Sequence, residues 1–329
     1  MDEKRNGGVV AAFAMTHTPG LGNLMHLPPR DQIERIEAGF GVIRQRLEEA
    51  KPDVVVAFVN DHFDMYTTQG MPGFAIALND THWGPTPETE NWIEMKRAPI
   101  PGNADLAHDI YGSLMEDGFE LFRSDSAELV HNVLLAKKFI WPDYDIPVVP
   151  IFTNCFITPL PTFRRAHALG RAVRAVLDRR PERVALIATG GISHWPPIVF
   201  DHDDPNDPFV ERVRAFNKHG RAIWDKDPTL AGAILERERE MAQSGRELIN
   251  IEWDKEILDQ LARADVSTLT ALDHESVREI AGPGGSEMLM WVSLMGAMKD
   301  READIVLYEA VKEWMGGVGL LSYARSIDN

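Results

Sequence analysis

Short apolar runs rich in β-branched residues recur along the chain up to residue 188, and turn residues bound each of them. A short apolar run between turn signals is typical of a strand buried inside a sheet. The pattern therefore predicts buried strands at Val9 to Met15, Val54 to Val59, Phe74 to Leu78, Val148 to Phe152 and Val184 to Ala188.

Helical patterns lie between these runs. Ala104 to Met115 and Arg165 to Leu177 are two of them, and a third begins after Asp31, which we expect to cap it. Its apolar residues are spaced by 3, 4, 3 and 4 positions and so share one face: Ile33, Ile36, Phe40, Ile43 and Leu47. Strands that alternate with helices predict an α/β fold with a mostly parallel or mixed central sheet, flanked by helices.

The pattern changes in the C-terminal third of the chain. After residue 205 the strand signal largely stops and helices dominate, so we expect this third to be helix-rich. The charged run Glu236 to Glu240 is typical of a solvated helix face. The acidic segment Asp201 to Asp207 is the best candidate for a domain boundary, but it could equally be a surface loop inside one domain.

Charge excludes some classes of partner. The chain has 34 basic and 51 acidic residues, which gives a formal net charge of −17. Such a chain is repelled by nucleic acid and by anionic membrane surfaces unless a local basic patch intervenes, and the sequence has none. The longest apolar runs are also far shorter than the roughly 20 residues that cross a bilayer. We therefore expect neither nucleic acid nor a membrane as a partner.

Cysteine usage narrows the chemistry further. Cys155 is the single cysteine, which excludes an intramolecular disulfide and any cysteine-rich zinc site. We interpret the run Val9 to Met15 as a strand and not as a signal peptide, because Asp2 to Arg5 before it carry no net side-chain charge. Together these features predict a cytoplasmic protein.

Three histidines share one kind of position. His17, His62 and His194 each lie just past the end of a predicted strand. In an open α/β sheet the carboxyl ends of the strands form the edge where ligands bind, so these imidazoles should converge. The alternative is that each is a structural loop histidine bonded to the backbone.

A converging histidine cluster suggests a metal. Neutral imidazole is the commonest protein ligand for metals, and since a single cysteine cannot make a sulfur-rich site, a histidine and carboxylate site would suit Fe(II), Mn(II) or catalytic Zn(II). Spacing leaves five carboxylates open, namely Asp61, Asp64, Glu252, Asp254 and Glu287. Glu287 opens the apolar segment Met288 to Met298, where a helix dipole favours a carboxylate, although an ordinary helix-start glutamate would look the same.

Several motifs, in their order and spacing, point to one family. They are Thr16-His17-Thr18-Pro19, Asn60-Asp61-His62, Gly190-Gly191-Ile192-Ser193-His194, Ile249 to Asp254, and Glu287 with Trp291. In these the chain resembles the class III (LigB-type) extradiol ring-cleavage dioxygenases, which use non-haem iron. The resemblance runs almost end to end and implies a single LigB-type catalytic domain over residues 1–329.

The resemblance also assigns roles. It implies that Fe(II) is held by His17, His62 and Glu287, and that His194 and His131 are catalytic acid/base residues. The chain departs from the family beside His131, because the usual Asp-His-Gly is replaced by Val130-His131-Asn132. The imidazole therefore lacks an aspartate neighbour, and a structural role for His131 remains an alternative.

The resemblance implies a reaction. A catechol-type aromatic and O2 would bind at the iron, His194 would accept a phenolic proton, and His131 would donate one during O–O cleavage. The product would be a ring-opened semialdehyde, in aromatic hydrocarbon catabolism, and the substrate a carboxylated catechol such as 2,3-dihydroxyphenylpropionate. Alternatives are protocatechuate, gallate or an aminophenol, a zinc hydrolase, and a non-catalytic interaction protein of the Memo type. We also expect a homo-oligomer.

Overall fold

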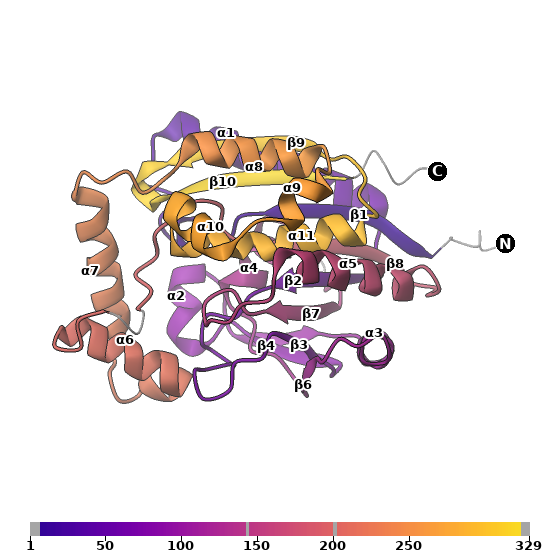
Figure 1. Cartoon of the computed structure of the whole chain (residues 1–329), viewed down its shortest axis with the longest axis horizontal. Helices are drawn as coiled ribbons and strands as arrows, with labels where there is room; N and C mark the ends of the chain where they lie inside the picture. The colour runs from indigo at the N-terminus through magenta and orange to yellow at the C-terminus, as the bar shows by residue number, and fades with distance from the viewer. Residues whose placement is uncertain (1–6, 143–144, 200–202, 324–329) are drawn as a thin grey trace.

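The computed structural model describes residues 7–142, 145–199 and 203–323, which form a mixed sheet with helices on both faces (Figure 1). The predicted fold class is confirmed, and so are the five predicted strands. The strands of the main sheet are β1 (Gly8–Met15), β2 (Val54–Val59), β3 (Phe74–Ala77), β6 (Phe122–Ser124), β7 (Val148–Thr153), β8 (Arg183–Thr189), β9 (Asp304–Val311) and β10 (Gly316–Ser322).

The strand order is β6-β3-β7-β2-β8-β1-β10-β9. The four strands β7, β2, β8 and β1 at the centre run parallel, because β2 pairs in parallel with both β7 and β8, and β8 with β1. β10 then pairs antiparallel with β1 and with β9. The carboxyl ends of β1, β2 and β8 consequently lie together at one edge of the sheet.

Both faces of the sheet are buried, as the β2 sequence requires. Val54, Val56 and Phe58 belong to the core on the face covered by α5 (Phe163–Leu177) and α11 (Met288–Ala297). The alternate residues Val55, Ala57 and Val59 belong to the opposite core, under α1 (Arg30–Ala50) and α4 (His131–Ile140). A strand covered on both sides is apolar at every position, which explains the run.

The remaining elements surround this frame. A separate ribbon consists of β4 (Thr81–Gly84) and β5 (Ala98–Pro101). The other helices are α2 (Glu90–Ile93), α3 (Ala104–Glu116), α6 (Pro208–His219), α7 (Leu230–Gln243), α8 (Ile251–Ala262), α9 (Val266–Thr270) and α10 (His274–Ala281). Short 3₁₀ segments are η1 (Pro19–Leu21), η2 (Pro87–Thr89), η3 (Gly220–Ile223), η4 (Pro283–Glu287) and η5 (Lys312–Trp314). Figure 1 shows α6 and α7 at the end of the molecule opposite the N-terminus.

The predicted cap of the first helix is wrong. α1 begins at Arg30 with Pro29 at the N-cap, and no side chain caps it. Asp31 lies inside the first turn, where its carboxylate accepts a hydrogen bond of 2.9 Å from Nη1 of Arg35. An aspartate in the first turn of a helix still interacts favourably with the helix dipole. Asp31 therefore marks the start of α1, although it lies inside the first turn and not at the N-cap.

The C-terminal third is helix-rich as predicted, but it ends in two strands that the hydrophobic pattern did not indicate. β10 contains Gly316, Gly317 and Gly319, and glycine is depleted in strands because it has no side chain to pack. It is nevertheless buried throughout, between β1 and β9. β9 has mostly half-buried residues and so lacks a sharp alternation.

Two other expectations concern the same third. Asp201 and His202 of the boundary candidate lie outside the described residues, and Asp207 at its end caps α6 by accepting a hydrogen bond from the amide of Phe209. The division into domains therefore stays a prediction. Within the charged run on α7, Glu236 and Glu240 are exposed as expected, whereas Glu238 is half-buried.

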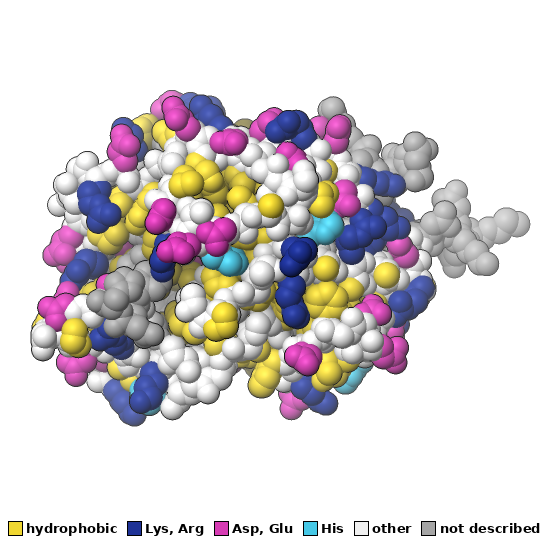
Figure 2. All heavy atoms as spheres, viewed as in Figure 1, with side chains coloured by type: hydrophobic (Ala, Val, Ile, Leu, Met, Phe, Trp, Pro, Cys, Tyr) yellow, Lys and Arg dark blue, Asp and Glu magenta, His cyan; other side chains and the backbone are white. Residues whose placement is uncertain are grey.

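On the face shown in Figure 2, basic and acidic side chains are interspersed. Across the described residues, no helix combines the length and the apolar character that crossing a membrane demands.

Candidate metal centre

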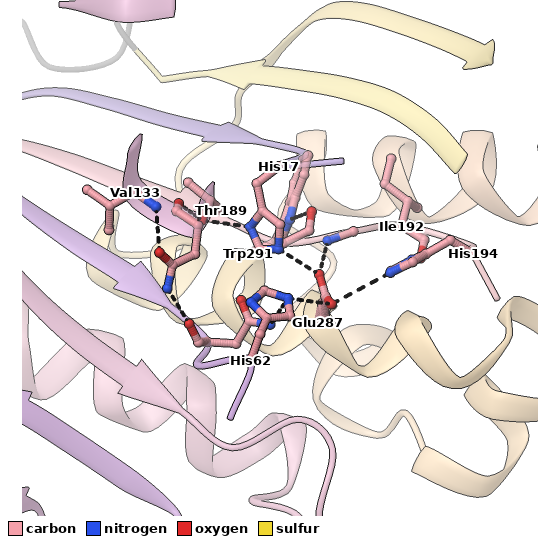
Figure 3. Close-up of polar contacts among 12 residues, drawn as sticks. His17, His62, Val133, Thr189, Ile192, His194, Glu287 and Trp291 are labelled. Carbon is pink, nitrogen blue, oxygen red and sulfur yellow. Dashed lines mark hydrogen bonds and ion pairs between the residues drawn. The ribbon is translucent and has the colours of Figure 1, made fainter. Parts of the chain in front are cut away.

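The three histidines predicted to converge meet around one carboxylate (Figure 3). His17 follows β1, His62 follows β2 and His194 follows β8, while Glu287 is the N-cap residue of α11. Nε2 of His17 lies 3.2 Å from Oε2 of Glu287. Nε2 of His62 and Nε2 of His194 lie 3.7 Å and 3.6 Å from Oε1 of the same residue. The sheet edge thus brings together side chains from four separate segments.

His131, to which only the family resemblance pointed, joins this cluster. It is the first residue of α4, and its ring centroid lies 4.2 Å from that of His62 and 5.2 Å from that of His17. One ring nitrogen from each of these three histidines lies within 4.8 Å of the other two, so the group could hold a metal ion. The indole of Trp92 covers His131, with ring centroids 4.9 Å apart.

Of the five carboxylates left open by spacing, Glu287 is the one that contacts the histidines. Asp61 instead accepts hydrogen bonds from the amides of Met65 and Tyr66 and so holds its own loop. Asp254 accepts one from the amide of Ser193. Neither Asp64 nor Glu252 forms an ion pair or hydrogen bond with these imidazoles in the described part of the chain, and Glu252 is exposed.

A threonine at the end of β8 fixes the tautomer of His17. The hydroxyl of Thr189 donates to the carbonyl of Asn132 over 2.5 Å, so its oxygen is left to accept. Nδ1 of His17 lies 2.9 Å from that oxygen and must therefore carry the proton. In the neutral ring, Nε2 of His17 is then left with a lone pair, buried and without a hydrogen-bond partner among the described residues. This is the form of imidazole that binds a metal.

The lone pair of His17 points at another acceptor. Nε2 of His17 and the carboxylate of Glu287 face each other at 3.2 Å with no proton to share, which is unfavourable unless a positive charge lies between or beside them. Nε2 of His62 faces Glu287 at 3.7 Å and accepts a hydrogen bond from Nδ2 of Asn60 over 3.2 Å, a bond that a bound cation would have to displace. Two lone-pair nitrogens and a carboxylate are the donor set of a divalent cation, so these residues fit a metal.

The surroundings of His17 and Glu287 shift their pKa values toward the protonation states that could bind a cation. Burial lowers the pKa of His17, although Glu287 opposes this. Burial alone would raise the pKa of Glu287, but His17 and His194 outweigh it and hold the pKa well below its usual range. Burial, with His62 and His17 nearby, holds the pKa of His131 well below normal. At neutral pH the imidazoles of His17 and His131 are therefore neutral, and Glu287 is ionised.

His194 lies in a narrow slot. Its Nδ1 donates to the carbonyl of Ile192 over 2.9 Å, which leaves Nε2 as the nitrogen that faces Glu287. A Cβ atom built on Gly191 or on Gly284 would lie 2.0 or 2.1 Å from Cε1 of the ring. Only glycine at these two positions leaves room for the imidazole. Burial by itself lowers the pKa of His194, but the carboxylate of Glu287 outweighs it and raises the pKa.

A structural histidine in the same molecule shows the contrast. His82 is buried, its Nε2 donates to the carbonyl of Val148 over 3.1 Å, and its Nδ1 accepts from the amide of Ala127 over 3.1 Å. Both of its nitrogens are satisfied by backbone, whereas His17 keeps one nitrogen free. His82 is therefore a structural histidine bonded to the backbone, and His17 is not.

Sequence reasoning missed the residues that support the cluster. Thr189 holds His17, and its hydroxyl hydrogen bonds to Asn132, whose Nδ2 donates to the carbonyl of Asn60 over 2.5 Å. This chain of bonds links the ends of β8, α4 and β2. Their positions in the sequence could have indicated them, because Thr189, Asn132 and Asn60 each stand next to or near a motif histidine.

Comparison with known proteins identifies the family. The family model described as the catalytic LigB subunit of aromatic ring-opening dioxygenase matches residues 11–320. The most similar curated relatives are named 2,3-dihydroxyphenylpropionate/2,3-dihydroxicinnamic acid 1,2-dioxygenase, among them the enzymes of three organisms. That of Burkholderia vietnamiensis is 29% identical, covering 93% of this chain and 95% of the relative. That of Cupriavidus necator is 28% identical, covering 92% and 94%. That of Photorhabdus laumondii is 26% identical, covering 95% and 96%.

Proposed function

We propose that this chain, which belongs to the LigB family of aromatic ring-opening dioxygenases, cleaves a carboxylated catechol at an Fe(II) ion held by His17, His62 and Glu287. Family membership makes the chain a metal-dependent enzyme that opens catechol-type rings with O2. The identity of the metal, the roles of the residues and the ring substituents are the proposed part.

One observation carries the ligand assignment, namely the unprotonated Nε2 of His17, which faces the Glu287 carboxylate at 3.2 Å inside the protein. A buried lone pair opposite a buried carboxylate is costly unless a cation is shared between them. Two histidines and one carboxylate are a donor set that suits Fe(II). When bound, the metal supplies Lewis acidity toward the catechol hydroxyls and redox chemistry toward O2.

His194 is the proposed general base. Its Nδ1–H is committed to the carbonyl of Ile192, so when the ring is neutral the lone pair of Nε2 faces Glu287 and the space around it. Glu287 raises the pKa of His194, which makes Nε2 a stronger proton acceptor. A base needs this arrangement, in which one nitrogen is fixed and the other is free to accept a substrate proton. Gly191 and Gly284 lie against the ring, which leaves it little room to move.

His131 is the proposed proton donor, and since burial keeps it neutral at rest by lowering its pKa, it must take up a proton released by the substrate before it can donate one. Its ring lies beside His62 and His17, and among the described residues none forms a hydrogen bond to either of its nitrogens. The imidazole is thus not committed to the backbone as His82 is. Val130 is buried beside it where the family has aspartate, so His131 would act without a carboxylate neighbour.

The proposed substrate class follows the names of the relatives. Those enzymes are named for 2,3-dihydroxyphenylpropionate and 2,3-dihydroxicinnamic acid, which are catechols with a carboxylated side chain. Protocatechuate, gallate and an aminophenol remain substrates that the same metal chemistry would serve. They are distinguished by assay.

The test is to load metal-free protein with Fe(II) anaerobically, add each aromatic in turn, admit O2 and follow the yellow ring-fission product. We expect the largest kcat/KM with 2,3-dihydroxyphenylpropionate, and iron to be lost in His17→Ala. His26→Ala is the matched control, because His26 is exposed and bonds only to the carbonyl of Asn23. Higher kcat/KM with protocatechuate would refute the substrate, and stoichiometric iron in His17→Ala would refute the ligand set.

A further inference from the structure

One buried carboxylate near the site has no role in the reaction described above. Asp254, on α8, is fully buried, with 0% of its surface exposed. We propose that Asp254 is the positioning residue that holds the imidazole of His194 in the orientation for proton transfer. The proposal deepens the proposed function and depends on it, since it requires His194 to be the base.

Both oxygens of Asp254 are engaged. Oδ1 accepts from the amide of Ser193 over 2.8 Å, and Oδ2 accepts from the hydroxyl of Tyr308 on β9 over 2.7 Å. A buried carboxylate is tolerated when its oxygens are bonded in this way. The N-cap residue of α8 makes a second contact with Ser193, because the amide of Asn250 donates to Oγ of Ser193 over 2.8 Å.

The connection to His194 runs through a single peptide unit. The N–H of Ser193 and the C=O of Ile192 belong to the same planar amide, so neither can rotate without the other. The N–H donates to Asp254 and the C=O accepts from Nδ1 of His194 over 2.9 Å. Asp254 therefore fixes the plane of the amide whose carbonyl fixes the imidazole, and hydrogen bonds in such a chain strengthen one another.

The other contacts of His194 constrain its backbone but do not choose the tautomer. The amide of His194 donates to the carbonyl of Ala281 over 2.9 Å, and Gly191 and Gly284 flank the ring. These contacts would hold the ring in its slot even with the Ile192 carbonyl turned away. Among the contacts of His194 with described residues, the Ile192 carbonyl is the one that fixes a proton on Nδ1, which in the neutral ring leaves the lone pair on Nε2.

A double-mutant cycle separates positioning from general stability. Asp254→Ala should lower kcat on the order of 10²-fold, the usual effect of a small misplacement of a catalytic group, with KM and iron content unchanged. In the His194→Ala background the same substitution should cause no further loss, because there is no imidazole left to position. A merely structural aspartate would lower kcat by the same factor in both backgrounds.

Two variants keep the test usable if Asp254→Ala fails to fold. Asp254→Asn retains an acceptor for Ser193 and should restore most of kcat, whereas Asp259→Ala is the matched control on the same helix, at an exposed residue paired with Arg263. In metal-free protein, the Nδ1–H proton resonance of His194 should be visible in the wild type and Asp254→Asn, and lost to exchange in Asp254→Ala.

Two outcomes would overturn the proposal. One is an equal loss of kcat in both members of the cycle, and the other is an Nδ1–H resonance unchanged in Asp254→Ala. Failure of the proposed function looks different, because His194→Ala alone would then keep full turnover.

Discussion

The prediction that tests the site most strictly concerns Thr189, which supports His17, and not one of the proposed ligands. Thr189→Val replaces the hydroxyl with a methyl group of similar size, so packing is kept while two hydrogen bonds disappear. Nδ1–H of His17 loses its acceptor at 2.9 Å, and the carbonyl of Asn132 loses its donor at 2.5 Å. His17 and Thr189 are only 3% and 1% exposed, so water does not replace the lost partner.

The magnitude follows from burial. Leaving a buried donor unsatisfied costs about 1–3 kcal/mol, so the metal-free protein should lose that much of its free energy of unfolding. The tautomer of His17 is also no longer fixed, and loss of such a partner typically weakens metal affinity by about 10–100-fold. That factor corresponds to roughly 1.4–2.8 kcal/mol of binding free energy.

The assay is anaerobic titration of metal-free protein with Fe(II), beside urea unfolding of the same sample. Thr153→Val is the control, because Thr153 also ends a central strand and is 1% exposed, but its hydroxyl has no hydrogen-bond partner among the described residues. Removing an unpaired hydroxyl should leave both iron affinity and the free energy of unfolding the same or slightly better.

The reasoning fails if Thr189→Val binds Fe(II) as tightly as the wild type. Loss of stability without loss of affinity would mean that Thr189 joins β8 to α4 and does nothing for His17. Equal loss in both threonine variants would mean that the iron site responds to any substitution at this edge.

The remaining predictions test the other assignments. His194→Ala should keep iron but lose roughly 10²- to 10⁴-fold in turnover, measured as kcat beside iron content, and full activity would move the base elsewhere. His131→Ala should bind catechol normally under nitrogen but slow a step after O2 is admitted, seen by stopped-flow absorbance, and unchanged turnover would make this histidine structural. Val130→Asp should change kcat more than KM, because a carboxylate neighbour raises the pKa of His131, and a change confined to KM would contradict this. Alanine at each proposed ligand should abolish iron binding by metal analysis, with stoichiometric iron in all three disproving the set: His17, His62 and Glu287.

The central strands and the first helix could be predicted from the sequence because their hydrophobic patterns are distinctive. β2 is apolar at every position since both of its faces are covered, and the pattern of α1 is regular because one of its faces meets the core. β10 escaped detection because Gly316, Gly317 and Gly319 replace the β-branched residues that mark a strand. Its strand character comes from pairing with β1 and β9, which is a long-range fact.

The site divides in the same way. Convergence of His17, His62 and His194 could be predicted, because each follows a strand end and strand ends share an edge. The choice among the carboxylates could not be made from spacing. Asp61 and Glu287 look alike in the sequence, and only the fold directs one to backbone amides and the other to the imidazoles. Supporting contacts such as Thr189 with His17 join residues 172 positions apart.

The scattered origin of the cluster has a consequence for synthesis. His17 and His62 leave the ribosome early, but Glu287 stands at the start of α11, which packs against α5 and must arrive before the set is complete. β1 also needs β10 beside it. A nascent or truncated chain without α11 therefore has no complete site, so metal uptake should report that the fold is finished. A free metal concentration of a hundred times the dissociation constant would then add about 2.7 kcal/mol to the free energy of unfolding, and only in the completely folded chain.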